Sequence, residues 1–203
     1  MNLPKAKPFL GLRKLFHVLV SSIAPLAYWY LPFWIPVMEV RDFVLTVLLF
    51  ALIVFLVLDA TRLLFPPVNR WIMKHFSGLI RETEKKKMTG ATYTCLSFLV
   101  VVFLFPRDIA VAAMLFLTLG DTAAEIAGNN WGRKRYRGRS LEGMAGFFTA
   151  VLPLSWIIFQ NGVVAFTGAV VGAWIEFFSV GVDDNLTVPL LSAAGLWCLS
   201  YVV

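Results

Sequence analysis

Long uninterrupted blocks of apolar residues constrain the fold of this chain more than any other feature. The blocks run to roughly 16 to 20 residues, the length an α-helix needs to cross a bilayer core of about 30 Å. A large soluble core would instead show amphipathic periodicity. Hydrophobic residues make up 59% of the 203 residues and charged residues only 15%. The sequence therefore predicts an all-α, polytopic integral membrane protein.

Seven candidate transmembrane helices can be placed on the chain. They cover residues 15–37, 43–60, 90–105, 108–127, 144–159, 163–179 and 187–203. The longest segments between them are 61–89 and 128–142, which are too short for a separate soluble domain. Residues 1–203 are therefore interpreted as one integral membrane domain.

Lysine and arginine are distributed very unevenly between the two ends of these helices. With the N-terminus in the cytoplasm, 16 of the 18 cations lie on the cytoplasmic side and only Arg41 and Arg107 on the other. Basic loops mark the cytoplasmic side of membrane proteins, so the net charge of +6 does not require a nucleic-acid partner. We expect an odd number of crossings, with the C-terminus on the opposite side of the membrane.

The segment after Pro66 and Pro67 has the pattern of an amphipathic helix. Its apolar residues recur at helical spacing: Val68, Trp71, Ile72, Phe76, Leu79 and Ile80. Its cations take the other face: Arg70, Lys74 and Arg81. This pattern is typical of a helix lying in the membrane interface. The alternative is a short re-entrant or protein-packed helix.

Several carboxylates fall where a membrane protein usually avoids them. Asp121 and Glu125 are four residues apart near the cytoplasmic end of the fourth helix, so they share a face. Glu176 continues the four-residue spacing of Gly168 and Gly172, whose small size allows close helix approach. This spacing predicts that Glu176 lies in a packed interior and not in lipid.

Asp183, Asp184 and Asn185 follow in the next cytoplasmic loop, so all these acids are expected at one membrane level. Ionisable groups in membrane segments are costly and tend to mark function. The alternative is a set of structural ion pairs with nearby arginines. The convergence of Asp121, Glu125 and Asp184 with basic loops favours function.

The cytoplasmic loop 128–142 is suited to binding phosphate. It carries three glycines and five cations, and flexible backbone amides together with Arg or Lys can surround an anion. On composition alone it could equally be a topology determinant. Ser140 is predicted to cap the fifth helix and Thr187 the seventh, which would turn two helix N-termini toward the same site.

Carboxylates, basic loops and two helix N-termini together indicate a nucleoside triphosphate site with a divalent cation. Mg²⁺ typically takes one or two carboxylates plus phosphate oxygens. The sequence contains no GxxxxGK[ST] motif and no kinase glycine loop, which excludes the ATP-dependent enzymes that use them.

Two stretches resemble the signature blocks of a family of CTP-dependent lipid-alcohol kinases. They are GDTAAEIAGNNWGRKRYRGRSLEG at 120–143 and EFFSVGVDDNLTVPLLSA at 176–193. The family includes dolichol or polyprenol kinase, phytol kinase and CTP-dependent diacylglycerol kinase. RKLFH at 13–17 and RETEKKKMTGATY at 81–93 are similar to weaker family features.

The resemblance implies roles for individual residues. Asp121 resembles the metal-binding aspartate, with Glu125 beside it, and Asp184 with Asn185 matches a D-N pair. Lys134 and Arg139 fall in the family's basic nucleotide loop, and Ser140 with Glu142 stands in its K/R-S-x-E-G element. Arg133, Lys134 and Arg139 are expected to grip the phosphate oxygens, and Ser140, Glu142 and Asn185 to bind the nucleotide as well. Arg139 stands where lysine is common, which keeps the charge.

The sequence thus predicts transfer of the γ-phosphate of CTP to a membrane lipid alcohol at the cytoplasmic interface. Asp121 and Glu125 would hold Mg²⁺, with Glu176 a possible third ligand. Asp184 would orient or deprotonate the hydroxyl, or serve as a further metal ligand.

The first block also resembles phosphatidate cytidylyltransferase, which makes a cytidylyltransferase acting on a lipid phosphate the main alternative. An ion-coupled transporter is the alternative of another class, although such proteins bind near the midplane.

Overall fold

A computed structural model describes residues 11–32, 34–35, 38–76, 79–133, 135–178 and 183–201. The predominantly helical fold is confirmed. The helices are α1 (Leu12–Tyr30), α2 (Val40–Leu64), α3 (Pro66–His75), α4 (Gly90–Leu104), α5 (Arg107–Leu115), α6 (Thr122–Trp131), α7 (Leu141–Phe159), α8 (Gly162–Phe178) and α9 (Asp184–Leu199). A 3₁₀ turn, η1 (Glu82–Lys86), precedes α4, and a π-helical turn, η2 (Phe116–Asp121), joins α5 to α6.

Two short antiparallel hairpins complete the described fold. Strand β1 (Trp34–Ile35) pairs with β2 (Met38–Glu39), and β3 (Arg135–Tyr136) pairs with β4 (Arg139–Ser140).

Three of the helical segments are long and apolar enough to cross a membrane. They are Val40–Leu64, Arg107–Trp131 and Leu141–Phe159, and the apolar helices Gly90–Leu104 and Gly162–Phe178 are shorter. The second of the three is the continuous helix formed by α5, η2 and α6. The total of seven crossings, with α1 and α9 among them, stays a prediction.

The predicted first helix, 15–37, was wrong at its C-terminal end. Helix α1 ends at Tyr30, and Leu31 is already extended, with φ −66° and ψ 142°. Pro32 explains the ending because proline disfavours helical geometry in the residue before it. The amphipathic helix predicted after Pro66 is present as α3, but it ends at His75 instead of continuing to Ile80.

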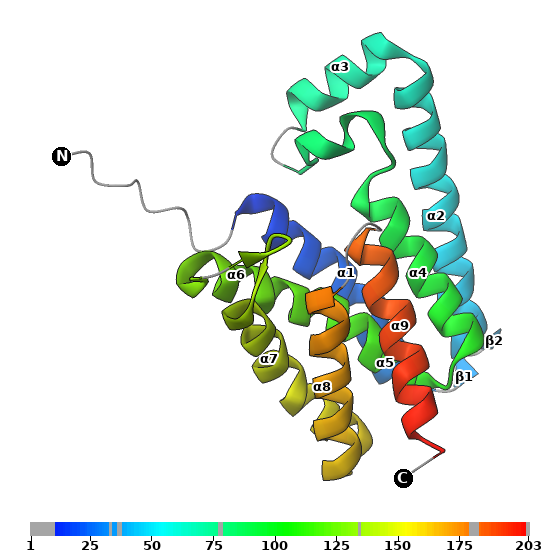
Figure 1. Cartoon of the computed structure of the whole chain (residues 1–203). Helices are drawn as coiled ribbons and strands as arrows, with labels where there is room; N and C mark the ends of the chain where they lie inside the picture. Colours follow the sequence, from blue (N-terminus) through cyan, green and yellow to red (C-terminus); the bar gives the residue numbers. More distant parts are fainter. Residues whose placement is uncertain are drawn as a thin grey trace.

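The helix α5–η2–α6 forms the centre of the molecule. Every residue from Ile109 to Thr118 is buried, and α1, α7 and α9 pack against this segment. Figure 1 shows α7, α8 and α9 side by side, with α2 and α4 on the far side of α9. The α7–α8 connection lies at one end of the bundle, whereas α3 and the start of α9 lie at the other (Figure 1).

Glycines allow α8 to pack closely against its neighbours, as its sequence spacing predicted. A Cβ on Gly168 would lie 2.6 Å from Leu196 Cδ2 of α9, and one on Gly172 would lie 2.7 Å from the Phe116 ring of η2. Real Cβ atoms essentially never lie this close to another atom, so a larger residue at either position would force its neighbour to move. Glu176 follows on this face and is only 2% exposed, so its predicted burial in a packed interior is confirmed.

Arg41 and Arg107, the two cations predicted on the non-cytoplasmic side, cap helix C-termini. Arg107 donates hydrogen bonds to the carbonyls of Tyr28, Trp29 and Leu31 at the end of α1. Arg41 donates to two carbonyls at the end of α4. Cations at these positions satisfy carbonyls that lack helical partners and complement the helix dipole, which gives both arginines a structural role.

Candidate functional site

Asp121 and Glu125 converge on a lysine from the first helix. The Lys14 Nζ atom lies 2.8 Å from Asp121 Oδ2 and 2.6 Å from Glu125 Oε2. Lys14 is 6% exposed and Asp121 is also buried. The predicted shared face of the two acids is therefore confirmed, and its cation comes from α1, 107 residues away in sequence from Asp121.

Arg139 holds a second group of carboxylates. Its Nη1 atom pairs with Glu176 and lies 3.7 Å from Asp121 Oδ1, while its Nη2 atom lies 2.5 Å from Asp184 Oδ2. The planar guanidinium can reach partners in different directions at once. Arg139 thereby joins acids from η2, α8 and α9, and Asp121 belongs to both groups. The predicted convergence of these acids at one level is confirmed.

The π-helical turn η2 positions Asp121. Residues Phe116 to Asp121 form this turn within an otherwise α-helical segment, and such turns are frequent at functional sites. The Thr118 hydroxyl donates to the carbonyl of Met114, and the Thr122 hydroxyl donates to that of Thr118. These bonds satisfy buried polar atoms beside Asp121 without using its carboxylate, which stays available to the cations.

The β3–β4 hairpin positions Arg139. Its two loop residues, Arg137 and Gly138, have φ values of 50° and 90°, as two-residue hairpin loops often require. Arg135 donates to the Gly128 carbonyl and to Asn129 Oδ1, which ties the hairpin to the end of α6. On the other side, the Tyr136 ring stacks on the Phe177 ring of α8 with centroids 6.2 Å apart.

The predicted helix caps were half right. Ser140 caps α7, and its hydroxyl accepts a hydrogen bond of 3.1 Å from the Gly143 amide. Thr187 does not cap α9, because that helix begins three residues earlier and Asp183 accepts a hydrogen bond from the Asn185 amide. An aspartate caps a helix as well as a threonine does, so the sequence contained both candidates.

A polar pocket of about 250 Å³ lies where these elements meet. It is lined by Arg81, Asp121, Ala124, Glu125, Gly128, Asn129, Arg135, Arg137, Gly138, Arg139, Ser140, Gly143, Glu176 and Asp184. Six of the residues singled out in the sequence are among them: Asp121, Glu125, Arg139, Ser140, Glu176 and Asp184. They come from five separate elements.

The other predicted nucleotide-binding residues are placed differently. Asn185 is buried, and its side-chain amide donates to Asp183 Oδ1 at 2.6 Å. Glu142 accepts a hydrogen bond of 3.3 Å from the backbone amide of the exposed residue Arg133. None of these three lines the pocket. Lys134 lies outside the described residues.

Five cations of the site were not named as functional residues from the sequence: Arg13, Lys14, Arg81, Arg135 and Arg137. Lys14 contacts two of its acids, and the pocket is lined by Arg81, Arg135 and Arg137. For Lys14 and Arg81 the available signal was the weak likeness of the segments that contain them to family features. Arg135 and Arg137 share their loop with the predicted cations, and only the hairpin register shows that they face the pocket.

The electrostatics of the pocket keep Arg139 charged. Burial alone would lower the pKa of the Arg139 guanidinium, but the negative charges of Asp184, Glu176 and Asp121 raise this pKa above its ordinary value. A raised arginine pKa places its titration far above physiological pH. Arg139 is therefore a permanent positive charge among three carboxylates.

The donor set fits a divalent cation that also binds phosphate, but it does not form a complete protein cage. Among the described residues, no group of three or more His, Cys, Asp or Glu side chains could hold a metal ion. Mg²⁺ needs only one or two carboxylates when phosphate supplies the other oxygens. Asp121 and Glu125, which converge on Lys14, could supply those carboxylates.

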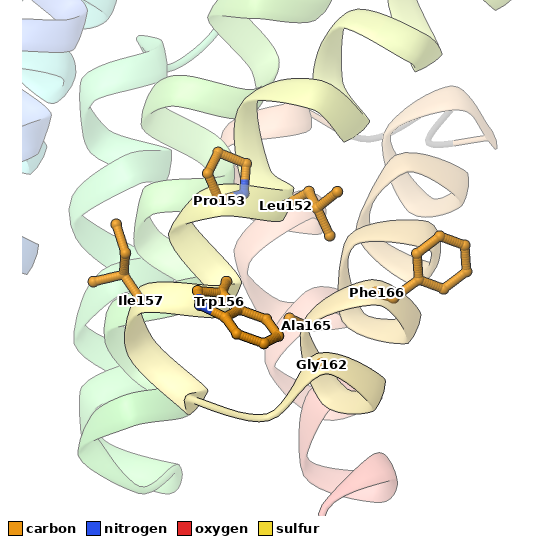
Figure 2. Close-up of a pocket in the computed structure, with 7 residues that line it drawn as sticks. All are labelled: Leu152, Pro153, Trp156, Ile157, Gly162, Ala165 and Phe166. Atoms are coloured by element: carbon orange, nitrogen blue, oxygen red, sulfur yellow. The ribbon is translucent and has the colours of Figure 1, made fainter.

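A second cavity, of about 500 Å³, lies between α7 and α8 near their connection. Figure 2 shows Leu152, Pro153, Trp156 and Ile157 on α7 around it, with Ala165 and Phe166 on α8. These side chains offer no charged group, so this cavity suits an apolar occupant. It lies at the far end of α7 from Ser140.

Several curated proteins are similar to this chain. CTP-dependent diacylglycerol kinase 1 of Schizosaccharomyces pombe is 28% identical over 172 residues, which cover 71% of the chain and 74% of the relative. Phytol kinase of Synechocystis sp. is 38% identical over 105 residues, covering 46% of the chain and 45% of the relative. The uncharacterized protein RP860 of Rickettsia prowazekii is 25% identical over 202 residues, covering 94% and 92%. No family model and no solved structure matches the chain.

Fold and site together define a helical protein with membrane-length apolar segments and an arginine-lined carboxylate pocket at one end. Among proteins of this kind, the chain is similar to CTP-dependent diacylglycerol kinases and to a phytol kinase. These similarities support a CTP-dependent lipid kinase.

Proposed function

We propose that this protein transfers the γ-phosphate of CTP to the hydroxyl of a membrane lipid alcohol. The observation that carries the proposal is the pocket in which Asp121, Glu125, Glu176 and Asp184 meet arginines at one end of an apolar helix bundle. Phosphoryl transfer depends on positioning and charge neutralisation more than on covalent chemistry, and this pocket supplies both. The kinase names of the similar proteins support CTP as the donor.

Asp121 and Glu125 would hold Mg²⁺, because their carboxylates already converge on one point, the Lys14 Nζ atom. When bound, the ion would neutralise the phosphate oxygens. Glu176 would act through Arg139, with which it pairs in the interior. Asp184, at the start of α9, also pairs with Arg139, and its side chain is 25% exposed. There it can accept the proton of a lipid hydroxyl that enters from the membrane interface.

The same arrangement supports a proposed membrane topology. The pocket end of the bundle carries the basic loops, which favour the cytoplasmic side, so this end would face the cytoplasm, with the N-terminus there and the C-terminus opposite. Single cysteines in place of Gly138 and Asn161 should then label from opposite sides of sealed vesicles. Because Gly138 lies in the β3–β4 loop and Asn161 between α7 and α8, labelling of both from one side would show that α7 does not cross the membrane.

Nucleotide choice tests the activity itself. With purified protein and a panel of diacylglycerol, phytol, geranylgeraniol and polyprenol, CTP should support phosphorylation and ATP should give little or none. The products should be CDP and a lipid phosphate. Release of pyrophosphate from a lipid-phosphate substrate would instead establish a cytidylyltransferase, and equal rates with ATP would contradict the proposed donor.

A further inference from the structure

Arg81 contributes a cation to the pocket from a part of the chain that the signature blocks do not include. It lies just before η1 and lines the pocket together with Asp121, Arg135, Arg137 and others from α6 to α9. Within the described residues, its guanidinium makes no ion pair with a carboxylate. By contrast, Arg139 is engaged by three carboxylates, so its charge is already neutralised by the protein.

A buried polar network fixes the connection that carries Arg81. Asp59 and Arg62 of α2 are each 2% exposed, and Arg62 Nε donates to Asp59 Oδ1 at 2.6 Å. Arg62 also donates to the carbonyls of Glu84 and Lys87. Asp59 Oδ2 accepts from the Thr89 amide at 2.8 Å and from the Thr92 hydroxyl at 2.6 Å. All of these groups are satisfied by protein atoms, so the network is structural.

The buried side chain of Glu84 links the two ends of the same connection. Its Oε2 atom accepts from the Arg81 amide at 3.1 Å, and its Oε1 atom accepts from the Gly90 amide at 3.2 Å. The backbone of Arg81 is thereby held at a fixed place relative to the start of α4. A pre-positioned arginine loses less freedom when it binds an anion.

We propose that Arg81 binds the phosphate oxygens of the nucleotide and that the Asp59–Arg62–Glu84 network positions it; this inference rests on the proposed function. Arg13, Lys14 and Arg139 are already paired with the four acids of the pocket, so a triphosphate needs cations that these acids do not engage. Arg81, Arg135 and Arg137 line the pocket and form no ion pair with its acids within the described residues. Arg135 and Arg137 come from the same hairpin, whereas Arg81 lies just before η1 and reaches the pocket from a separate part of the chain.

The test compares two substitutions that remove the same charge from neighbouring positions. Arg81→Gln should raise both the Kd for CTP, measured by calorimetry without lipid, and the KM for CTP by about 10-fold to 100-fold, as loss of a charged hydrogen bond does. The kcat should change little, because ground-state phosphate contacts act mainly on binding. Arg81→Lys should recover part of the affinity. Lys85→Gln is the control, since Lys85 is exposed on η1 and does not line the pocket.

A double-mutant cycle tests the positioning role. Asp59→Asn should also raise the KM for CTP, and its effect should be non-additive with that of Arg81→Gln because both act through one residue. Thr92→Val removes a single hydroxyl of the network and takes the place of Asp59→Asn if that variant does not fold. Additive effects would overturn the positioning role.

The inference and the proposed function fail in different ways. If the wild-type protein turns over CTP but Arg81→Gln binds it normally, or if Lys85→Gln weakens binding equally, Arg81 is not a phosphate-binding residue. If the wild-type protein neither binds nor turns over CTP, the proposed function is wrong and the inference falls with it.

Discussion

Asp121→Asn is expected to reduce turnover by a factor on the order of 10² or more, roughly 2.7 kcal/mol in activation free energy, while the protein stays folded. The asparagine keeps the size of the side chain but loses the charge that Mg²⁺ and the developing phosphoryl charge require. Folding should persist because Lys14 retains Glu125 and Arg139 retains Glu176 and Asp184 as partners.

The measurement is rate against both CTP and Mg²⁺, with thermal unfolding in detergent as the check on folding. Asp108→Asn is the matched control, because Asp108 is exposed in the first turn of α5, at the opposite end of the same continuous helix. Near-normal activity of Asp121→Asn at ordinary Mg²⁺ would show that the metal lies elsewhere.

Asp184→Asn should lower kcat with little change in Mg²⁺ dependence if Asp184 acts on the lipid hydroxyl.

Arg139→Gln should damage both stability and activity. It would leave Glu176 buried without its cation and would place Asp121 and Asp184 near one another without the charge between them. Removing one partner of a buried ion pair costs about 3–5 kcal/mol, so a large fall in the unfolding temperature is expected. Because the pKa of Arg139 is raised, raising the pH within the physiological range should not reproduce the effect.

Two further variants separate charge from geometry at this position. Arg139→Lys keeps the charge but cannot reach Glu176 and Asp184 with separate nitrogens, so it should restore stability only in part. Arg133→Gln removes an exposed cation from the same loop and should leave the unfolding temperature within the small range typical of surface changes. A stable Arg139→Gln protein would mean that the acids do not depend on this cation.

Much of the fold followed from local patterns in the sequence. The helical segments were predicted from apolar runs, and the close packing of α8 from the spacing of Gly168, Gly172 and Glu176. The errors lie at helix ends: α1 ends before Pro32, and α9 begins at Asp184. Helix ends depend on capping contacts and on single prolines, which a hydrophobicity pattern does not weigh.

The acids of the site were predictable because topology alone brings helix ends to a common level. Asp121, Glu125, Glu176 and Asp184 each stood out as a charge beside an apolar run, and the structure brings them together. Their cations did not stand out in the same way, because the chain has 18 Lys and Arg residues and most lie in basic loops. Arg139 was singled out by the family resemblance of its loop, whereas only side-chain contacts distinguish Lys14 from the other cations.

The sequence by itself determined a helical membrane architecture and one end at which its acids gather. Both follow from forces that act locally along the chain, namely the cost of exposing polar groups to lipid and the periodicity of the α-helix. The tertiary structure decided which cation meets which acid, namely Lys14 with Asp121 and Arg139 with Glu176. It also brought Arg81, just before η1, to the pocket. Such pairings depend on distances across the packed helices, over separations as long as 107 residues, and no local pattern encodes them.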